Sequence, residues 1–414
     1  MSSTTIRSFK KSAPFIFCRS VIQHLRPIVE FMAAILTEAK PTKLNLPRLN
    51  LEDSTRRKLV KIVSQNPTLL YLTLESNLYP TLECLKENFG MDAHSLSCML
   101  RSCPSILGLS VEDNLRLTRQ FLVEQLELTD PNDLSRCVKR HPQILALSLE
   151  NLNSKVRFFQ SLEAFGDAAE GYQDHDDEFA GDAFQGPNKS LACRIAVSAP
   201  SAYSLSLKDN LKPKIATLAK LWGASPEELN YLVEQSTSLT PPCPGINLLA
   251  KQLKEYPNIL TLSLETNLQP TIDFYNRTGY ISLDSDGYLL QVVGDNLAET
   301  VKGNFEKPKT KTPTIMRARY LAASLYSRLL PRWHFVQEHR QTTDDLAVSD
   351  KEMSHNIFTK APPLHVLAMY DDAKFCDHFA LEVDDFVTYR KVAGKSLKFS
   401  TQFANWVKNG TPID

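Results

Sequence analysis

The sequence lacks the short motifs by which the common enzyme folds are recognised. It contains no G-x-x-x-x-G-K-[ST] phosphate loop, no G-x-G-x-x-G dinucleotide loop and no G-x-S-x-G nucleophile turn. Nucleotide hydrolysis and acyl transfer therefore have no support in the sequence. We expect a protein that is not an enzyme, without catalytic residues and without a cofactor.

Metal-ligand patterns are scarce as well. The eight cysteines include no C-x-x-C pair, so they indicate small buried side chains in a reducing compartment, with neither a zinc site nor a disulfide framework. The run Asp174, His175, Asp176 and Asp177 has suitable residue types. Its glycine-rich setting favours a solvated acidic loop over a preorganised site. We expect no bound metal.

Long apolar runs are also missing. A membrane-spanning helix needs about 18 or more consecutive apolar residues. The longest apolar run, near Ile28–Leu36, is shorter and is interrupted by Glu30. We therefore expect no membrane-spanning segment.

The first 29 residues contain no acid. They carry five serines and the five basic residues Arg7, Lys10, Lys11, Arg19 and Arg26. This composition is typical of an organelle transit peptide, and the alternative is a disordered basic terminus of a cytosolic protein. We predict a transit peptide without folded structure over residues 1–45, cleaved before Leu49.

The balance of charge hides a pattern. The chain has 47 basic and 47 acidic residues, yet residues 165–190 carry one lysine and seven acids. Residues 341–414 are also mildly acidic, whereas residues 1–164 and 191–340 are mildly basic. This distribution fits a basic face on a repeat array but does not by itself require nucleic acid.

One phrase recurs along the chain. Its copies begin at Pro67, Pro104, Pro142, Pro200 and Pro257, and a degraded sixth copy begins at Ala318. Most copies carry paired aliphatic residues, then Leu-Ser/Thr-Leu and often Glu-x-Asn-Leu. The copy at Pro200 has Ala-Tyr in place of the aliphatic pair. Self-similarity at a spacing of about 20–50 residues is the mark of a repeat array.

The phrase predicts a turn between two helices. The leading proline ends the preceding helical pattern, and the hydroxyl residue with a nearby acid, as in Ser110 and Glu112, is a helix start signal. Ser225-Pro-Glu-Glu228 is a further capping box. Glycine stops follow four of the copies, at Gly90, Gly166, Gly223 and Gly279. A leucine-rich repeat is the alternative, but its strands fit these signals poorly. We predict an all-α fold, an α-solenoid of stacked helical repeats.

The uneven spacing of the copies predicts insertions and the domain limits. We expect the array over residues 46–340, with an acidic loop insert at 166–190 and a basic loop at about 300–313. The extra length after Gly223 is either an eroded repeat or a helical insertion. Residues 341–414 are expected to form a C-terminal helical cap and an acidic tail, because the end of an array must be covered.

The pattern Pro-x-Ile-Leu-x-Leu-Ser-x-Glu-x-Asn-Leu, with the ending Arg328-Leu-Leu-Pro-Arg332, resembles the mTERF family of mitochondrial transcription termination factors. The resemblance covers about residues 50–335. It implies mTERF-type repeats stacked into a curved superhelix with a basic groove. It also implies import into mitochondria, or alternatively chloroplasts or other plastids. Such proteins bind double-stranded DNA or organellar RNA and regulate transcription, including termination, or other organelle gene expression, without catalysis.

Binding would depend on basic side chains, whereas the phrase residues build the repeat. Pro67, Pro104, Pro142, Pro200, Pro257 and Pro331 are expected to define the repeats. Phosphate contacts supply affinity without sequence choice, and any single cation is more often an ordinary solvated charge. The candidates are Arg101, Arg116, Arg119, Lys139, Arg140, Lys155, Arg157, Lys212, Lys214, Arg317, Arg319, Arg328 and Arg332.

The expected partners are organellar DNA or RNA, with the transcription machinery as a further partner and no membrane, and we expect a monomer. The alternative is an α-solenoid adaptor that binds a protein in its concave groove, since solenoids present extended surfaces. A groove lined by Leu, Phe and Tyr with few cations would favour the adaptor. We also hypothesise that the acidic insert shields the groove.

Overall fold

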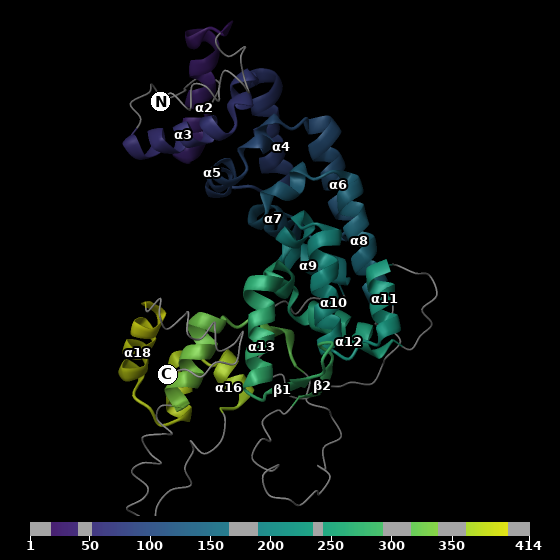
Figure 1. The fold of residues 1–414 in the computed structure, drawn as a ribbon. Coiled ribbons are helices and arrows are strands. Elements are labelled where there is room, and N and C mark those ends of the chain that lie inside the picture. Colours follow the sequence, from purple (N-terminus) through teal and green to yellow (C-terminus); the bar gives the residue numbers. More distant parts are fainter. Residues whose placement is uncertain are drawn as a thin grey trace, which may run out of the picture. The chain divides into compact units, whose positions relative to one another are not determined.

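The structure is a computed structural model that describes residues 18–39, 52–164, 189–234, 243–292, 316–337 and 362–395. The predicted all-α fold is confirmed, because helices make up most of the described chain and its strands form only one short hairpin (Figure 1). The chain divides into two compact units. Unit 1 comprises Met1–Ser161 with Glu178–Leu205, and unit 2 comprises Leu162–Asp177 with Ser206–Asp414. The predicted acidic insert, apart from Lys189 and Ser190, and the predicted basic loop lie outside the described residues.

Each repeat of unit 1 consists of an upstream helix, a 3-10 turn that begins at the phrase proline, and a downstream helix. The upstream helices are α3 (Asp53–Gln65), α5 (Ala93–Ser102), α7 (Pro131–Arg140) and α9 (Leu191–Ser198). The 3-10 turns are Pro67–Tyr71, Pro104–Gly108, Pro142–Ala146 and Pro200–Ser204. The downstream helices are α4 (Tyr79–Phe89), α6 (Leu117–Glu124) and α8 (Leu149–Glu163).

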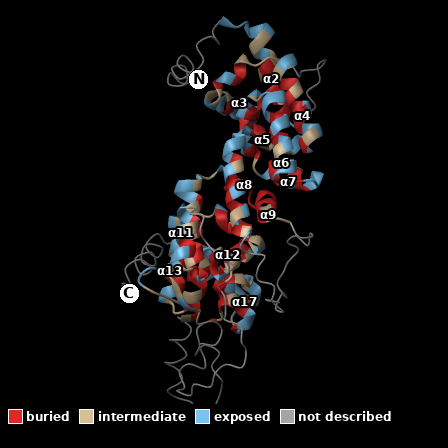
Figure 2. Cartoon of the chain, turned by 90° about the vertical axis from the view of Figure 1, so that its right-hand side faces the viewer, coloured by how far each residue is buried: buried red, intermediate tan, exposed pale blue. Residues whose placement is uncertain are grey.

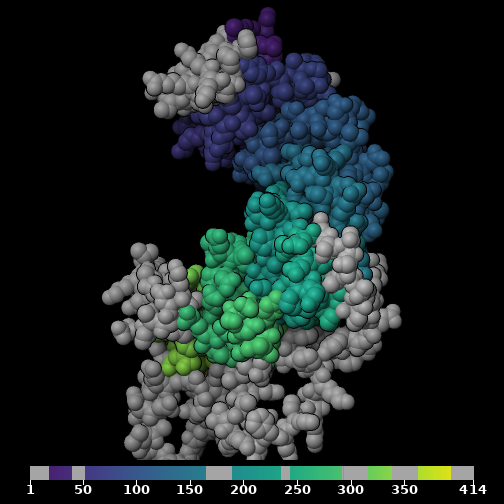
Figure 3. Space-filling view, turned by 45° about the vertical axis from the view of Figure 1, so that its right-hand side comes forward, coloured from purple at the N-terminus to yellow at the C-terminus, as the bar shows by residue number. Residues whose placement is uncertain are grey.

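The 3-10 turns form the spine of unit 1. The proline stands first in each turn, where its missing N–H costs nothing. The aliphatic pairs that follow, such as Ile106 and Leu107, are fully buried. Each turn contacts the next, from Pro67–Tyr71 through to Pro200–Ser204. The buried residues line the inner sides of the helices (Figure 2), and neighbouring repeats follow one another on the surface (Figure 3).

The hydroxyl of the phrase starts the downstream helix, as predicted. Ser110, Ser148, Ser206, Ser263 and Ser324 each accept a hydrogen bond from the backbone N–H three residues later. Thr73 is the exception, because its hydroxyl bonds to the Asn77 side chain. These bonds satisfy N–H groups that would otherwise lack partners at the helix start.

The first turn of most downstream helices is of the π type. The leucine N–H bonds to the carbonyl five residues back in Leu78, Leu115, Leu211, Leu268 and Leu329. The third repeat has one residue fewer between its hydroxyl and its leucine, and Leu152 bonds to Ser148 four residues back at 3.0 Å. All six leucines are buried. The π turn therefore accommodates one extra residue while keeping the leucine in the core.

Three of the predicted glycine stops are confirmed. Gly90, Gly223 and Gly279 have φ angles of 60°, 77° and 79°, which glycine adopts without strain. The residue after each glycine then bonds to a carbonyl in the preceding helix. Met91 N–H bonds to Leu85 O, six residues back, at 3.2 Å, whereas Ala224 and Tyr280 bond to Ala219 O and Tyr275 O, five residues back. The fourth predicted stop, Gly166, lies outside the described residues.

Unit 2 continues the pattern with more variation. Its helices are α10 (Lys212–Leu221), α11 (Pro226–Glu234), α12 (Pro244–Glu255), α13 (Gln269–Arg277), α14 (Ala318–Leu321), a helix over residues 330–337, α16 (Leu364–Met369), α17 (Asp372–His378) and α18 (Val383–Lys395). A 3-10 turn spans Pro257–Thr261. An antiparallel hairpin joins β1 (Ile281–Leu283) to β2 (Leu289–Val292). Neither strand was predicted from the sequence, and Asp284–Gly287 form a tight turn that brings the two strands together.

The extra length after Gly223 contains a helical insertion, α11. Its predicted capping box is confirmed, since Ser225 N–H bonds to the Glu228 carboxylate at 2.6 Å and Glu228 N–H bonds to the Ser225 hydroxyl at 3.2 Å. The same buried carboxylate also accepts the N–H groups of Gly245 and Ile246 at the start of α12. Glu228 thus joins the first turns of two consecutive helices.

The prediction that residues 1–45 are unfolded is wrong for part of that segment. Helix α2 (Arg26–Leu36) begins with Arg26-Pro27 and buries Phe31, Met32, Ala34 and Ile35 in unit 1. It contacts α3 and α5. The apolar run that is too short for a membrane is therefore a core helix. None of the described helices combines the length and apolarity needed to cross a bilayer.

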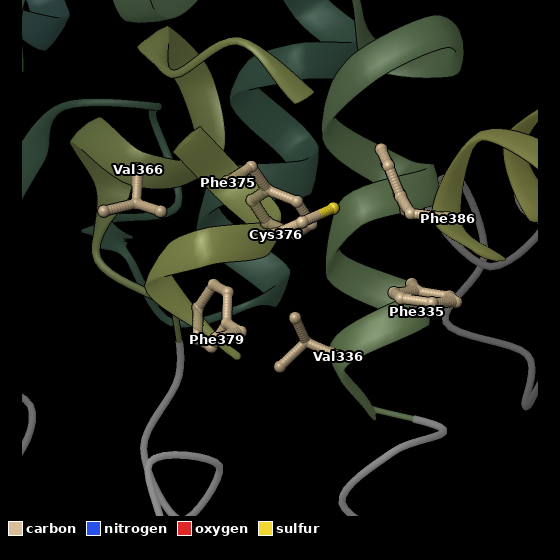
Figure 4. Close-up of a cluster of buried hydrophobic side chains, with 7 residues drawn as sticks. All are labelled: Phe335, Val336, Val366, Phe375, Cys376, Phe379 and Phe386. Atoms are coloured by element: carbon tan, nitrogen blue, oxygen red, sulfur yellow. The ribbon is translucent and has the colours of Figure 1, made fainter. Parts of the chain in front are cut away.

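The last described helices enclose a second apolar cluster. Phe335 and Val336 of the helix over residues 330–337 pack with residues of α16, α17 and α18, among them Phe375 and Phe386, and with Phe379 directly after α17 (Figure 4). The Phe335 and Phe386 rings lie 5.2 Å apart in an edge-on arrangement. This cluster attaches residues 362–395 to the final repeat.

Candidate nucleic-acid interface

Three of the thirteen candidate cations lie in the core. Lys155, Lys214 and Arg332 are each 1% exposed. Each stands three residues after the buried leucine of its first turn, a position that is Thr81, Thr118 and Thr271 in the other repeats, also buried. Because these side chains do not reach solvent, the expectation that they contact nucleic acid is wrong.

The buried position instead supplies hydrogen-bond donors to neighbouring backbone. Lys214 Nζ donates to Leu260 O in the next phrase at 2.5 Å, and Thr81 donates to Leu109 O at 3.5 Å. Lys155 donates to the side chain of Asn151. Burial lowers the pKa of both lysine amines. A buried carbonyl without a donor is costly, so Lys214, like Thr81, links its helix to the next phrase, whereas Lys155 bonds within α8.

Arg332 serves the same purpose at the end of the array. Its guanidinium donates to Leu367 O at 3.0 Å and to the Asp372 carboxylate at 3.0 Å, and it lies 4.8 Å from the Phe375 ring centroid. Burial lowers the pKa of Arg332, against the opposing effect of Asp372. Arg390 also pairs with Asp372, at 2.5 Å. This part of the Arg-Leu-Leu-Pro-Arg ending therefore holds the last helices in place.

Four further candidates bond to carbonyls at or near the last turns of neighbouring helices. Arg119 donates to Asn88 O at 3.2 Å, Arg140 to Ser198 O at 3.0 Å, Lys212 to Val233 O at 2.6 Å and Arg328 to Ala368 O at 3.1 Å. Carbonyls at a helix end lack partners within the helix, and a cation there also meets the negative end of the dipole. These side chains thus already stabilise the fold.

The remaining six candidates differ in their surroundings. Arg116 pairs with Glu112 at 2.6 Å, Lys139 pairs with Asp92 at 2.8 Å, and Arg101 bonds within its own helix. Arg317 is half-buried before α14, and Arg319 lies 5.8 Å from the Tyr320 ring centroid. Arg157 is exposed and has no hydrogen-bond or ion-pair partner in the described part of the chain. The structure does not bring the thirteen together into one site.

The candidates chosen from the sequence did not include several exposed cations on the upstream helices. Arg56, Arg57, Lys58 and Lys61 lie on α3, and Arg136 lies on α7. Alignment of the repeats on the phrase proline could have revealed some of them, because the residue six positions before that proline is basic in four of five repeats. Those residues are Lys61, Arg136, Arg194 and Lys251, and Cys98 takes the place in α5.

Unit 1 separates its charges between the two sets of helices. The upstream helices α3, α5, α7 and α9 carry nine basic and two acidic side chains. The downstream segments, each counted from the hydroxyl to the helix end or to Ser161, carry five basic and seven acidic ones. In Figure 1, α3, α5 and α7 follow one another on one side of unit 1, with α4, α6 and α8 on the other. We call the first side the upstream basic face.

Acidic partners already engage part of this face. The Lys139 ammonium lies 2.8 Å from Asp92, which also caps α5 by accepting the Ser95 N–H at 2.7 Å. The Lys139 ion pair, followed by the bonds from Ser95, holds the pKa of Asp92 well below its usual range. On α3, by contrast, Arg56, Lys58 and Lys61 are exposed and have no partner among the described residues. The α3 end of the face therefore presents the most available positive charge.

No group of three or more His, Cys, Asp or Glu side chains suited to a metal ion occurs in the six described ranges. None of the eight cysteines forms a disulfide. The observed chemistry of the upstream basic face is therefore that of exposed cations on a rigid helical scaffold, which suits the binding of anionic polymers.

The mTERF family model matches residues 43–164. Helices α3 to α8, with three of the phrase copies, fall in this range. No curated protein matches the chain.

Proposed function

Residues 43–164 place this chain in the mTERF family, and on that premise we propose that it binds organellar nucleic acid, double-stranded DNA in the first place. In this proposal the protein regulates transcription, including its termination, or another step of organelle gene expression, and it performs no catalysis. Its compartment is the mitochondrion, with the plastid as the alternative.

The observation that carries the proposal is the division of charge in unit 1. Cations concentrate on the upstream helices, which share a rigid core through the stacked 3-10 turns. Cations held on one side of a scaffold can contact successive phosphates of a nucleic-acid backbone. The mixed charge of the downstream segments offers no comparable surface.

The adaptor alternative has less support from the same face. Among the large apolar side chains of the described upstream helices in unit 1, Val60 is exposed, at 45%. A protein-binding surface carries aromatic and aliphatic anchors at its centre. The upstream basic face carries lysine and arginine instead.

Neutralising the α3 cations tests the proposal. The variant Arg56→Gln/Lys58→Gln/Lys61→Gln removes three exposed charges that make no partner contact in the described structure. We expect its affinity for a DNA duplex to fall about tenfold or more, and the slope of log K against log[salt] to decrease by up to about 2.7, since each lost phosphate contact is worth about 0.9. Fluorescence anisotropy between about 50 and 200 mM salt measures both quantities.

A matched control removes cations from the other side of unit 1. Lys86→Gln/Arg116→Gln/Arg157→Gln lowers the net charge by the same amount, with one substitution on α4, one in the turn before α6 and one on α8. Its affinity should change much less than that of the α3 variant. Equal losses in both variants would show that net charge alone matters, and an unchanged α3 variant would contradict the assigned face. If the protein shows no salt-dependent binding to duplex DNA or to RNA, the proposed function is refuted.

A further inference from the structure

The segment before α2 has the same geometry as the phrase of a repeat. Ser20 accepts the Gln23 N–H at 3.2 Å, and Leu25 N–H bonds to Ser20 O, five residues back, at 3.1 Å. The turn Val21–Leu25 is of the π type and leads directly into α2. The same capping bond and the same π turn open most downstream helices of the array.

The sequence around this turn matches the register of the phrase. Ser20-V-I-Q-H-Leu25-R-Pro27 aligns with Ser206-L-K-D-N-Leu211-K-Pro213. Three residues after Leu25 stands Ile28, which is 1% exposed, and the residues at that position in the other repeats are also buried. A proline, Pro14, also stands six residues before the hydroxyl. Helix α2 is thus the downstream helix of an additional repeat.

The packing of α2 supports this assignment. The Phe31 ring meets the Tyr79 ring edge-on at a centroid distance of 5.4 Å. Ser97 on α5 donates to Leu36 O at 3.4 Å, and His94 on the same helix pairs with Glu38 at 2.9 Å. Helix α2 contacts α5, the upstream helix two repeats further on, just as α4 contacts α7. It occupies the place that a preceding repeat would fill.

We infer that α2 remains part of the mature protein, and that any cut which removes a targeting leader falls before Ser20. A cut near residue 45 would expose the apolar surface of α3 and α5 that α2 covers, and an array needs a unit to cover its end. The inference depends on the proposed function in one respect only: organellar import is the reason to expect that a leader is cut off. The retention of α2 follows from its packing.

The cleavage site can be mapped directly. The full chain with a C-terminal tag is expressed in cells, recovered from the organelle fraction, and its first residue is determined by mass spectrometry. We expect a first residue at or before Ser20, including an uncleaved chain. A first residue between 21 and 49 overturns the inference. A protein that never enters an organelle counts against the proposed compartment, and the folding comparison that follows then decides on α2.

The folding comparison uses purified chains. The chain 19–414 should melt at the same temperature as the full chain, whereas 41–414 should melt at least about 5 °C lower or fail to fold. Because the short chain can fail for trivial reasons, Phe31→Ala is tested in the full chain against Val29→Ala, a change at a half-buried neighbour. The Phe31 variant should lower the melting temperature by about 5–15 °C, and more than the Val29 variant. Equal melting of 19–414 and 41–414, or equal effects of the two substitutions, overturns the inference.

Discussion

The upstream and downstream helices of unit 1 carry the same residue types but use them differently. On the downstream side, Lys155 is buried, Arg119 bonds to a carbonyl of α4, and Arg116 pairs with Glu112. On the upstream side, Lys58 and Lys61 are exposed with no partner among the described residues. The division is not complete, since Arg140 and Lys139 on the upstream side also have partners and Arg157 on the downstream side has none among the described residues. The available charge is nevertheless concentrated on α3.

The largest effect should come from removing a buried cation. Arg332→Ala deletes the bonds to Leu367 O and Asp372 and leaves a cavity beside Phe375. We expect the free energy of unfolding of unit 2 to fall by about 3 kcal/mol, since the loss of one partner leaves the other groups buried without compensation. Urea unfolding measures it. Arg328→Ala, at the exposed arginine of the same motif, should cost about 1 kcal/mol or less. Equal losses of unfolding free energy in the two variants would show that the buried arginine contributes no more to stability than the exposed one.

A second, smaller effect is the pH dependence of stability that the buried amine of Lys214 produces. Burial lowers the pKa of the Lys214 amine, so the unfolded chain binds a proton more readily than the folded chain between that lowered value and about 10.5. The unfolding free energy of the wild type, relative to Lys214→Met, should therefore increase as pH rises from 7 towards 10.5, by on the order of 1 kcal/mol. Urea unfolding at several pH values tests this. A difference that stays constant with pH would show that the amine is not desolvated.

The smallest effect concerns the restraint on the upstream basic face. Asp92→Asn frees Lys139 from its ion pair while keeping a residue that caps helices well. We expect duplex DNA to bind about two to three times more tightly, with little change in stability, because one exposed ion pair is worth well under 1 kcal/mol. Anisotropy titration checks the affinity, and thermal melting checks the cap.

Asp130→Asn is the matched control for that substitution. Asp130 caps α7 by accepting the Asn132 N–H at 2.9 Å and makes no ion pair among the described residues. Both variants gain the same charge, so a larger gain for Asp92→Asn isolates the release of Lys139. If both variants bind DNA equally, the ion pair has no influence on the upstream basic face.

Much of the fold could be predicted from the sequence because the repeat carries local signals. A proline, a hydroxyl and a glycine each specify a backbone state within a few residues, and Ser206 and Gly223 adopt those states as expected. The copy at Ser20 was missed because its composition also fits a transit peptide. Its apolar positions, and not its basic residues, determine the structure there.

The candidate site was harder to predict. Whether Lys214 is buried depends on Leu260 O, a carbonyl that the next phrase supplies from 46 residues away. No local pattern shows that contact, although threonine at the equivalent position of other repeats hints at burial. The charge on α3 required comparison of positions across the copies, since single arginines and lysines on helices are common.

The π turn at the start of the downstream helices has a consequence for how such a chain can change in length. With the extra residue the leucine N–H reaches back five positions, and without it, as at Leu152, four. The leucine stays buried in both cases. A one-residue insertion or deletion at this point is therefore absorbed within a single turn, whereas the same change further along the helix would rotate every later side chain by about 100°. The first turn of the downstream helix is therefore a point in the repeat at which the chain can gain or lose one residue while the leucine stays in the core.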